Sequence, residues 1–200
     1  MSSEAIRIRP AQPSDAESLR AVYAPYVERT AVTFEYAVPD TEEFARRVAA
    51  VTKTYPWLAA EENGQIAAYA YAVPFAARAA YGWAAEVSIY AAWDRRGEGL
   101  GRRLYAALEA ALRAQGLQNL NACIAWPAAD DPFLTKASAR FHERMGYRRA
   151  AHFHRCGLKF GRWYDMIWME KLIGAHETAR PVIPFSSLPE EVLREAGIEK

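Results

Sequence analysis

The spacing of apolar residues predicts a strand followed by two helices at the start of the chain. From Ala5 to Arg9 two isoleucines alternate with two arginines, which is the period of a half-buried strand. Pro13-Ser14-Asp15 indicates a helix start, and five apolar residues follow it at helical spacing: Leu19, Val22, Tyr23, Tyr26 and Val27. Asp40-Thr41-Glu42-Glu43 indicates a second helix start, which continues with apolar residues on one face: Phe44, Val48 and Val51.

The rest of the pattern predicts a mixed sheet whose faces are covered by helices. Residues 56–62 and 65–73 are separated by Asn63-Gly64, a dipeptide that favours a hairpin turn. Six segments follow in the order strand, helix, strand, helix, strand, strand: 83–91, 100–114, 120–126, 135–145 (ending at Gly146), 147–156 and 163–171. The complete order β-α-α-β-β-β-α-β-α-β-β predicts an α/β fold.

The last part of the chain has a different character. After about Gly174, three prolines interrupt regular structure, and residues 190–196 are typical of one short helix that begins after Pro189. We therefore expect a domain over residues 1–173. Residues 174–200 are predicted to form a tail that packs on the surface of this domain or across a dimer.

Composition and charge narrow the class of protein. The chain has 200 residues, of which 52% are hydrophobic and 24% charged, as is typical of a soluble globular domain. A net charge of +1 argues against nucleic acid or an anionic membrane as the main partner. Two cysteines, Cys123 and Cys156, are too few for a disulfide framework. With neither an apolar signal segment nor a membrane-spanning run, we expect a cytoplasmic protein.

Residues 95–103 predict a site for a phosphate or pyrophosphate group. Glycines at 97, 99 and 101 allow a ligand to approach the backbone, and four arginines surround them: Arg95, Arg96, Arg102 and Arg103. The free first-turn amides of the following helix add to this positive field. The segment matches neither the P-loop nor the dinucleotide fingerprint. Glycines and arginines at a helix start without any ligand are the alternative interpretation.

Arg96-x-x-Gly99-x-Gly101 resembles the pyrophosphate loop of the Gcn5-related N-acetyltransferases (GNAT). The predicted element order resembles that family over residues 5–172. Within the family, the chain is similar to the phosphinothricin and methionine sulfoximine N-acetyltransferases, on these residues and segments: Val73-Pro74-Phe75, Arg78, Tyr81, Glu86-x-Ser88-Ile89-Tyr90, Phe141-His142-x-x-x-Gly146-Tyr147 and Lys159-Phe160-Gly161-Arg162-Trp163-Tyr164-Asp165. The resemblance implies the acyl-CoA N-acyltransferase (GNAT) fold, a mixed and mostly antiparallel sheet flanked by helices.

The resemblance also implies acetyl-CoA as co-substrate, no metal, a small-molecule amine as acceptor and a homodimer. Backbone groups of Ile89, Tyr90 and Ala91 are expected to bind the pantetheine arm and the thioester oxygen. The other positions implied for cofactor binding are Arg96, Gly97, Glu98, Gly99, Leu100, Gly101, Arg102, Thr135 and Ser138.

Three positions depart from the family pattern. Ala24 and Thr135 stand where relatives usually have asparagine, and Ala76 stands where an arginine often follows the Pro-Phe pair. Ala24 and Ala76 fall in regions that shape the acceptor pocket, so these departures leave the identity of the acceptor open.

Two residues are candidates for proton transfer. Glu86 lies on the strand that leads into the glycine loop, among apolar neighbours that raise a carboxyl pKa, and the resemblance implies that it is the general base. A strand-edge glutamate that faces solvent is the alternative. His142 is the candidate acid for the departing thiolate, or else a histidine that binds a backbone carbonyl. His152, His154 and His176 show no metal-like grouping with carboxylates, and the first two are expected on one strand face.

The acceptor pocket is expected to combine aromatic walls with charged groups. The candidates are Phe34 and Glu35 after the first helix, and Phe75, Arg78 and Tyr81 before the catalytic strand. Arg78 offers a guanidinium to an acceptor carboxylate. Phe34 and Tyr81 are equally compatible with a packing role.

The sequence thus predicts an enzyme that moves acetyl from acetyl-CoA to the amine of a small amino-acid-like acceptor, by direct attack with general-base help. Two alternatives stay open. One is acetylation of another amine, such as a polyamine, an antibiotic or a protein N-terminus. The other is a non-catalytic acyl-CoA-binding module on the same fold.

Overall fold

The structure is a computed structural model that describes residues 6–199, and it contains a seven-stranded sheet. The strands follow the order β1 (Arg7–Pro10), β2 (Trp57–Glu62), β3 (Gln65–Pro74), β4 (Ala84–Ala91), β5 (Asn119–Trp126), β7 (Arg162–Leu172) and β6 (Arg148–Lys159). Neighbouring strands are antiparallel except for the parallel pair β4 and β5.

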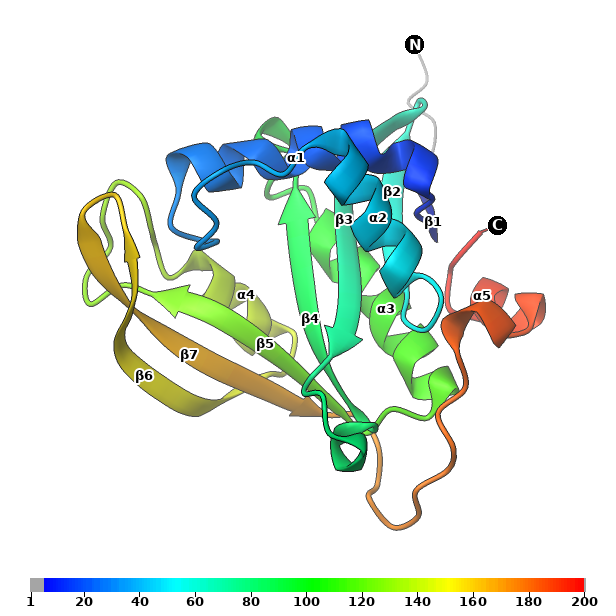
Figure 1. The fold of residues 1–200 in the computed structure, drawn as a ribbon. Helices are drawn as coiled ribbons and strands as arrows, with labels where there is room; N and C mark the ends of the chain where they lie inside the picture. The colour runs from blue at the N-terminus through cyan, green and yellow to red at the C-terminus, as the bar shows by residue number, and fades with distance from the viewer. Residues whose placement is uncertain (1–5, 200) are drawn as a thin grey trace.

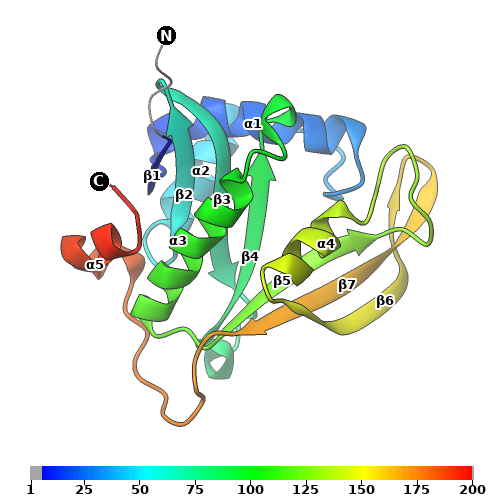
Figure 2. The ribbon, with the colours of Figure 1, turned by 180° about the vertical axis from the view of Figure 1, so that it is seen from behind.

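Helices cover both faces of this sheet (Figures 1 and 2). The helices α1 (Ala16–Arg29) and α2 (Thr41–Val51) lie on one face, and α3 (Leu100–Gln115) and α4 (Ala137–Arg144) lie on the other. A short helix, α5 (Glu190–Glu195), follows near the C-terminus. The predicted mixed, mostly antiparallel sheet flanked by helices is therefore confirmed. No helix of the described residues is long and apolar enough to span a membrane.

The sheet opens between β4 and β5, and this opening positions the site. The two strands pair only at Ala84, Ala85 and Glu86, opposite residues 119–121 of β5. Beyond Glu86 the strands diverge (Figure 1), while β4 stays paired with β3 as far as Ala91. The β5-facing edge of residues 87–91 is consequently left without a strand partner among the described residues.

The main core forms where α3 packs on the sheet. Leu100, Leu104, Leu108 and Leu112 are at most 2% exposed, as expected from their helical spacing. A second cluster lies under α1 and α2 and is rich in aromatic residues: Tyr23, Phe44, Trp57 and Tyr69. Apolar burial on both faces holds the two halves of the open sheet in place.

The C-terminal segment is packed into this core. Phe185, Leu188, Leu193 and Ile198 are at most 5% exposed and belong to the same cluster as α3. Backbone hydrogen bonds attach the segment at both ends, from Phe185 N to Thr54 O (2.9 Å) and from Glu199 N to Ile8 O (2.8 Å). In Figure 1 it runs beside α3 and ends near β1.

Some element boundaries differ from the predicted ones. The hairpin of β6 and β7 extends to Lys159 and Arg162, because Phe160 (φ 49°) and Gly161 (φ 70°) both adopt the left-handed conformation of a tight two-residue turn. α4 begins at Ala137, since the Thr135 hydroxyl accepts a hydrogen bond from the Ala137 amide (3.3 Å) in the turn before the helix. Ala5, the first residue of the predicted strand, lies outside the described residues.

Candidate active site

A narrow cleft lies between the diverging strands β4 and β5. It has a volume of about 50 Å³ and is lined by residues 87–90 of β4, residues 122–125 of β5, and Ser138 and His142 of α4. Two of the three predicted pantetheine positions, Ile89 and Tyr90, thus line the cleft. The carbonyl of the third, Ala91, accepts a hydrogen bond from the Tyr26 hydroxyl (2.7 Å).

The glycine loop lies between β4 and α3. Gly97 (φ 90°) and Gly99 (φ 82°) are left-handed, and a Cβ on either would meet no atom within 4 Å. Arg95 holds the loop through Glu98 (2.8 Å) and Glu62 (2.6 Å). The open space around these two left-handed glycines, next to the first amides of a 16-residue helix, can accept an anionic group.

The third glycine of the loop has a different role. Gly101 is helical, and a Cβ at this position would lie 3.0 Å from Cε2 of Phe141 in α4. Gly101 therefore allows α4 to approach the first turn of α3. The absence of a side chain at Gly101 therefore makes room for the Phe141 ring of the protein itself, and not for a ligand.

Glu86 lies where the paired part of β4 ends and the opening begins. It is the last β4 residue paired with β5, and its side chain is half-buried. Burial raises the pKa of its carboxyl above the ordinary value. A carboxylate held in this way is a better base than an exposed one, and it stands next to the cleft in which the thioester is expected.

Tyr71 is a site residue that the sequence analysis missed. It pairs with Ser88 across β3 and β4. Burial raises the pKa of its hydroxyl, with smaller effects from a hydrogen bond with Ser88 and from the charges of Glu86, Arg47 and Glu35. The cross-strand register places Tyr71 beside Ser88, and no pattern along residues 65–73 indicates this contact.

The geometry of His142 argues against its expected role as the acid. The side chain is 3% exposed, and burial lowers its pKa to about 4. Nδ1 donates to the carbonyl of Ser138 (2.8 Å), so Nε2 is the unprotonated nitrogen and accepts from the Tyr105 hydroxyl (2.9 Å). A neutral imidazole with its single N–H bound to a carbonyl has no proton ready for a thiolate. The alternative interpretation, a histidine that binds a backbone carbonyl, agrees with these contacts.

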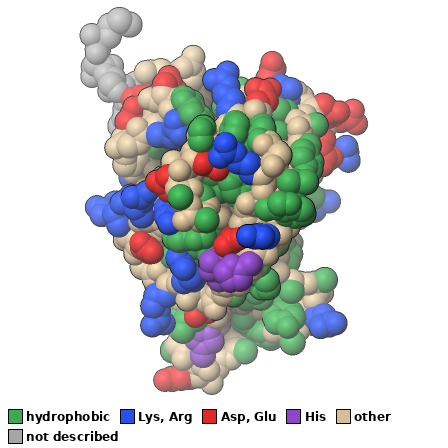
Figure 3. Space-filling model, turned by 90° about the vertical axis from the view of Figure 1, so that its left-hand side faces the viewer, with side chains coloured by type: hydrophobic (Ala, Val, Ile, Leu, Met, Phe, Trp, Pro, Cys, Tyr) green, Lys and Arg blue, Asp and Glu red, His purple; other side chains and the backbone are tan. Residues whose placement is uncertain are grey.

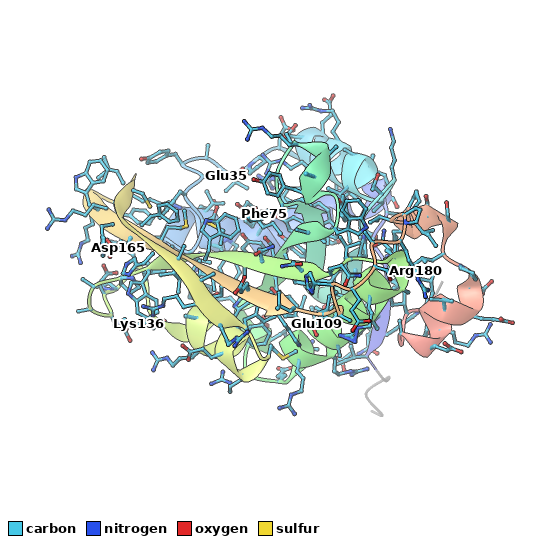
Figure 4. The ribbon with its side chains drawn as sticks, turned by 90° about the horizontal axis from the view of Figure 1, so that it is seen from below. Glu35, Phe75, Glu109, Lys136, Asp165 and Arg180 are labelled. Carbon is cyan, nitrogen blue, oxygen red and sulfur yellow. The ribbon has the colours of Figure 1, made fainter. Side chains whose placement is uncertain are left out.

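The predicted acceptor residues are not all brought together. Phe75 and Tyr81 contact each other (ring centroids 5.8 Å apart) and line a groove of about 670 Å³ with Trp168. Glu35 lies on the same side of the sheet as Phe75 (Figure 4) and binds Arg47 (2.9 Å). Arg78 is exposed and precedes a short helical turn, Ala79–Tyr81, outside the groove lining.

The loop that carries Phe34 and Glu35 is held by the β6–β7 hairpin. The Phe34 ring covers Gly157, where any Cβ would overlap it. Lys159 is 2% exposed and donates from Nζ to the carbonyl of Thr33 (2.8 Å). Burial lowers the pKa of this lysine. Phe34 thus has a packing role beside the candidate site, and Lys159 is a second residue that the sequence analysis missed.

Cys123 of β5 lines the cleft and bears on the chemistry. Desolvation, with smaller effects from Glu86 and Cys156, raises the pKa of Cys123 to about 12. The thiol therefore stays protonated at neutral pH, although its side chain is exposed to solvent at the cleft.

The expectation that His152 and His154 lack a carboxylate partner is wrong, because both rings contact Oδ2 of Asp165, at 2.7 and 3.2 Å.

Comparisons with known proteins agree with this architecture. Residues 8–168 match the family model described as an acetyltransferase (GNAT) domain. Phosphinothricin N-acetyltransferase of Streptomyces viridochromogenes is 32% identical over 92% of this chain and 96% of that protein. The L-methionine sulfoximine/L-methionine sulfone acetyltransferase of Salmonella typhimurium is 30% identical over 84% of this chain and 95% of that protein. A phosphinothricin acetyltransferase from Sinorhizobium meliloti, solved in complex with acetyl-CoA, superposes with a TM-score of 0.80 at 29% identity, over 90% of this chain and 97% of that one.

The open sheet with its glycine loop is thus the acyl-CoA-binding fold that the sequence predicts, and the chain belongs to the GNAT acetyltransferase family. It is an enzyme, an N-acetyltransferase with acetyl-CoA as its co-substrate.

Proposed function

We propose that the acceptor is the α-amine of a small free amino acid or of an analogue such as phosphinothricin or methionine sulfoximine. The names of the relatives support this acceptor class. The observation that carries the proposal is Glu86, a half-buried carboxyl with a raised pKa at the point where β4 and β5 part. An amino acid is an ammonium ion at neutral pH and needs such a base before it can react.

The reaction begins with proton removal. Glu86 takes a proton from the acceptor ammonium, and the free amine attacks the thioester carbonyl carbon, which forms the new C–N bond. The carbonyl oxygen becomes negative and is stabilised by backbone amides on the unpaired edge of residues 87–91. Because the Cys123 thiol stays protonated, direct attack is favoured over an acetyl-cysteine intermediate.

Collapse of the intermediate breaks the C–S bond and releases the thiolate of coenzyme A. The nitrogen of the intermediate still carries a proton that must be lost, and this proton neutralises the thiolate. His142 is not needed for this step, which fits its neutral, doubly hydrogen-bonded state. We assign His142 instead to the positioning of α4 along the cleft.

The cofactor is assigned to the cleft and the adjoining loop. The pantetheine arm follows the open edge of β4, and the pyrophosphate meets the backbone of Gly97, Gly99 and the first turn of α3. Arg96 and Arg102 are exposed at the loop and supply positive charge. Ser138 lines the cleft from α4, whereas Thr135 lies in the turn before that helix.

The acceptor is assigned to the side of the sheet that carries Glu86, Tyr71 and Glu35. One oxygen of Glu35 pairs with Arg47, and the other is buried without a hydrogen-bond partner among the described residues. This oxygen is suited to an ammonium or amide N–H of the acceptor. The acceptor carboxylate is assigned to Arg78, which requires that its exposed side chain turn towards the groove.

A substrate panel tests the proposal. Release of free thiol from acetyl-CoA is measured with phosphinothricin, methionine sulfoximine, the common amino acids, spermidine and a short peptide with a free N-terminus. Turnover of at least one amino-acid-type acceptor, well above that of spermidine and the peptide, is expected. Activity with spermidine or the peptide alone would contradict the proposal and indicate another class of acceptor.

We also propose that two copies of the chain form a dimer through the β6–β7 region. Four large apolar side chains are 39% to 62% exposed there: Phe153, Leu158, Phe160 and Trp163. Figure 3 shows hydrophobic side chains gathered on this end of the molecule. Exposed apolar patches of this kind are typical of protein interfaces. Light scattering coupled to gel filtration should give twice the mass of one chain, and a monomer mass would refute the assembly.

A further inference from the structure

Three polar side chains converge outside the catalytic cleft, on the β6–β7 hairpin. His152 Nε2 lies 2.7 Å and His154 Nδ1 lies 3.2 Å from the same oxygen of Asp165, Oδ2. The two imidazole rings are close to each other, with centroids 4.2 Å apart. All three candidate ligand atoms lie within 4.8 Å of one another.

A bulge in β6 creates this arrangement. Phe153 pairs with Met166, and the next paired residue of β6 is Gly157, opposite Tyr164. Residues 154–156 therefore lie opposite Asp165 alone. Arg155 has a φ of 48°, a left-handed value that is uncommon for a residue with a side chain. Bulges of this kind change the direction of nearby side chains and are frequent at functional positions.

The carboxylate of Asp165 is oriented by the bulge itself. Its second oxygen, Oδ1, accepts a hydrogen bond from the Arg155 amide (2.8 Å), which leaves Oδ2 directed towards the two histidines. A hydrogen bond to the outer atom of a ligating group is the usual means of fixing a metal ligand in place. In the single chain the side chain of Asp165 is 17% exposed and that of His154 is 75% exposed, so an ion can reach the cluster before two copies of the chain associate.

We propose that His152, His154 and Asp165 bind a divalent zinc ion, with water in the remaining coordination position. Two imidazole nitrogens and one carboxylate oxygen match the donor types that zinc prefers, at metal–ligand distances of about 2.0–2.2 Å. Tetrahedral ligands at these distances lie roughly 3.4 Å apart, so binding requires the Nε2–Oδ2 separation of 2.7 Å to widen and the 3.2 Å separation of Nδ1 and Oδ2 to change little. The ion then joins β6 to β7 across the bulge, at residues that do not line the cleft between β4 and β5.

Calorimetric titration of the untagged, EDTA-treated enzyme with zinc chloride tests the site. One ion per chain is expected. His152→Gln and His154→Gln each remove one ligand and should weaken binding by more than about tenfold. Zinc should also raise the melting temperature of the wild type but not that of the two variants, because only a folded site stabilises the chain.

Two further variants control for other sites. His176→Gln removes an exposed histidine outside the cluster, and Cys156→Ser removes the nearest thiol of the bulge. Both should bind zinc as the wild type does. Affinity that is unchanged in His152→Gln and His154→Gln, or lost in Cys156→Ser, would overturn the proposal. The absence of saturable zinc binding in the wild type would also overturn it and would show that the three side chains form only a hydrogen-bond network.

Discussion

At the level of single residues, Glu86 has a carboxyl with a raised pKa and lies where β4 and β5 diverge. We predict that Glu86→Gln lowers turnover roughly 100-fold, because the amide cannot take a proton, while acetyl-CoA affinity stays nearly unchanged. In the wild type, activity should rise with pH as this carboxyl loses its proton. Steady-state rates across pH measure both effects, and an acid limb that survives in Glu86→Gln would assign the base to another group.

Arg78 is the weakest member of the proposed acceptor site, because its side chain is exposed and outside the groove lining. If it binds the acceptor carboxylate, Arg78→Met should raise the acceptor KM by roughly tenfold or more, through loss of a charge-assisted hydrogen bond. The KM for acetyl-CoA should not change. Unaltered KM values for every active acceptor would leave Arg47, which lies beside Glu35, as the better candidate.

The roles of individual residues were harder to predict from the sequence than the position of the site. Glu86 could be proposed because the family resemblance implies a base at this position and its neighbours along the chain are apolar. Tyr71 and Lys159 could not, since their surroundings come from strands and loops distant in sequence. The acid role expected for His142 depended on its ordinary pKa, whereas burial and two hydrogen bonds leave it neutral.

At the level of elements, the loop between β4 and α3 offers a matched pair of substitutions. Gly99 and Gly64 both have a positive φ (82° and 75°), and a Cβ on either would meet nothing within 4 Å. Gly99→Asp and Gly64→Asp therefore introduce similar backbone strain and the same charge. We predict that only Gly99→Asp raises the KM for acetyl-CoA, roughly tenfold or more, because it places an anion at the helix N-terminus to which we assign the pyrophosphate.

Equal losses of cofactor affinity in the two variants would contradict this assignment of the loop. A circular-dichroism melt of each variant shows whether the backbone strain alone has unfolded the chain.

Most elements could be predicted because their periods are local properties. The leucine stripe of α3 and the Asn63-Gly64 turn between β2 and β3 can be recognised in short windows of sequence. The bulge of β6 was not predicted, since it depends on how residues 154–156 meet Asp165 on the next strand. The contact of His152 and His154 with a carboxylate was missed for the same reason.

At the level of the whole molecule, the C-terminal segment is energetically part of the domain. Leu193 is 2% exposed and lies in the cluster formed by α3, whereas Ile183 in the same segment is 45% exposed. Leu193→Ala should therefore lower the free energy of unfolding by about 2–5 kcal/mol, and Ile183→Ala by far less. Urea denaturation measures both, and equal effects would mean that the segment is only loosely attached.

The short pairing of β4 with β5 also has a consequence for the free enzyme. Three residue pairs join a four-stranded part of the sheet to a three-stranded part, and residues 87–91 present an unpaired edge beyond them. An unpaired edge can add a strand from another chain, which is a route to aggregation. Acetyl-CoA bound along this edge would block that route. Amide hydrogen exchange of residues 87–91 should accordingly slow when the cofactor binds, and the enzyme should be most prone to aggregate where coenzyme A is scarce.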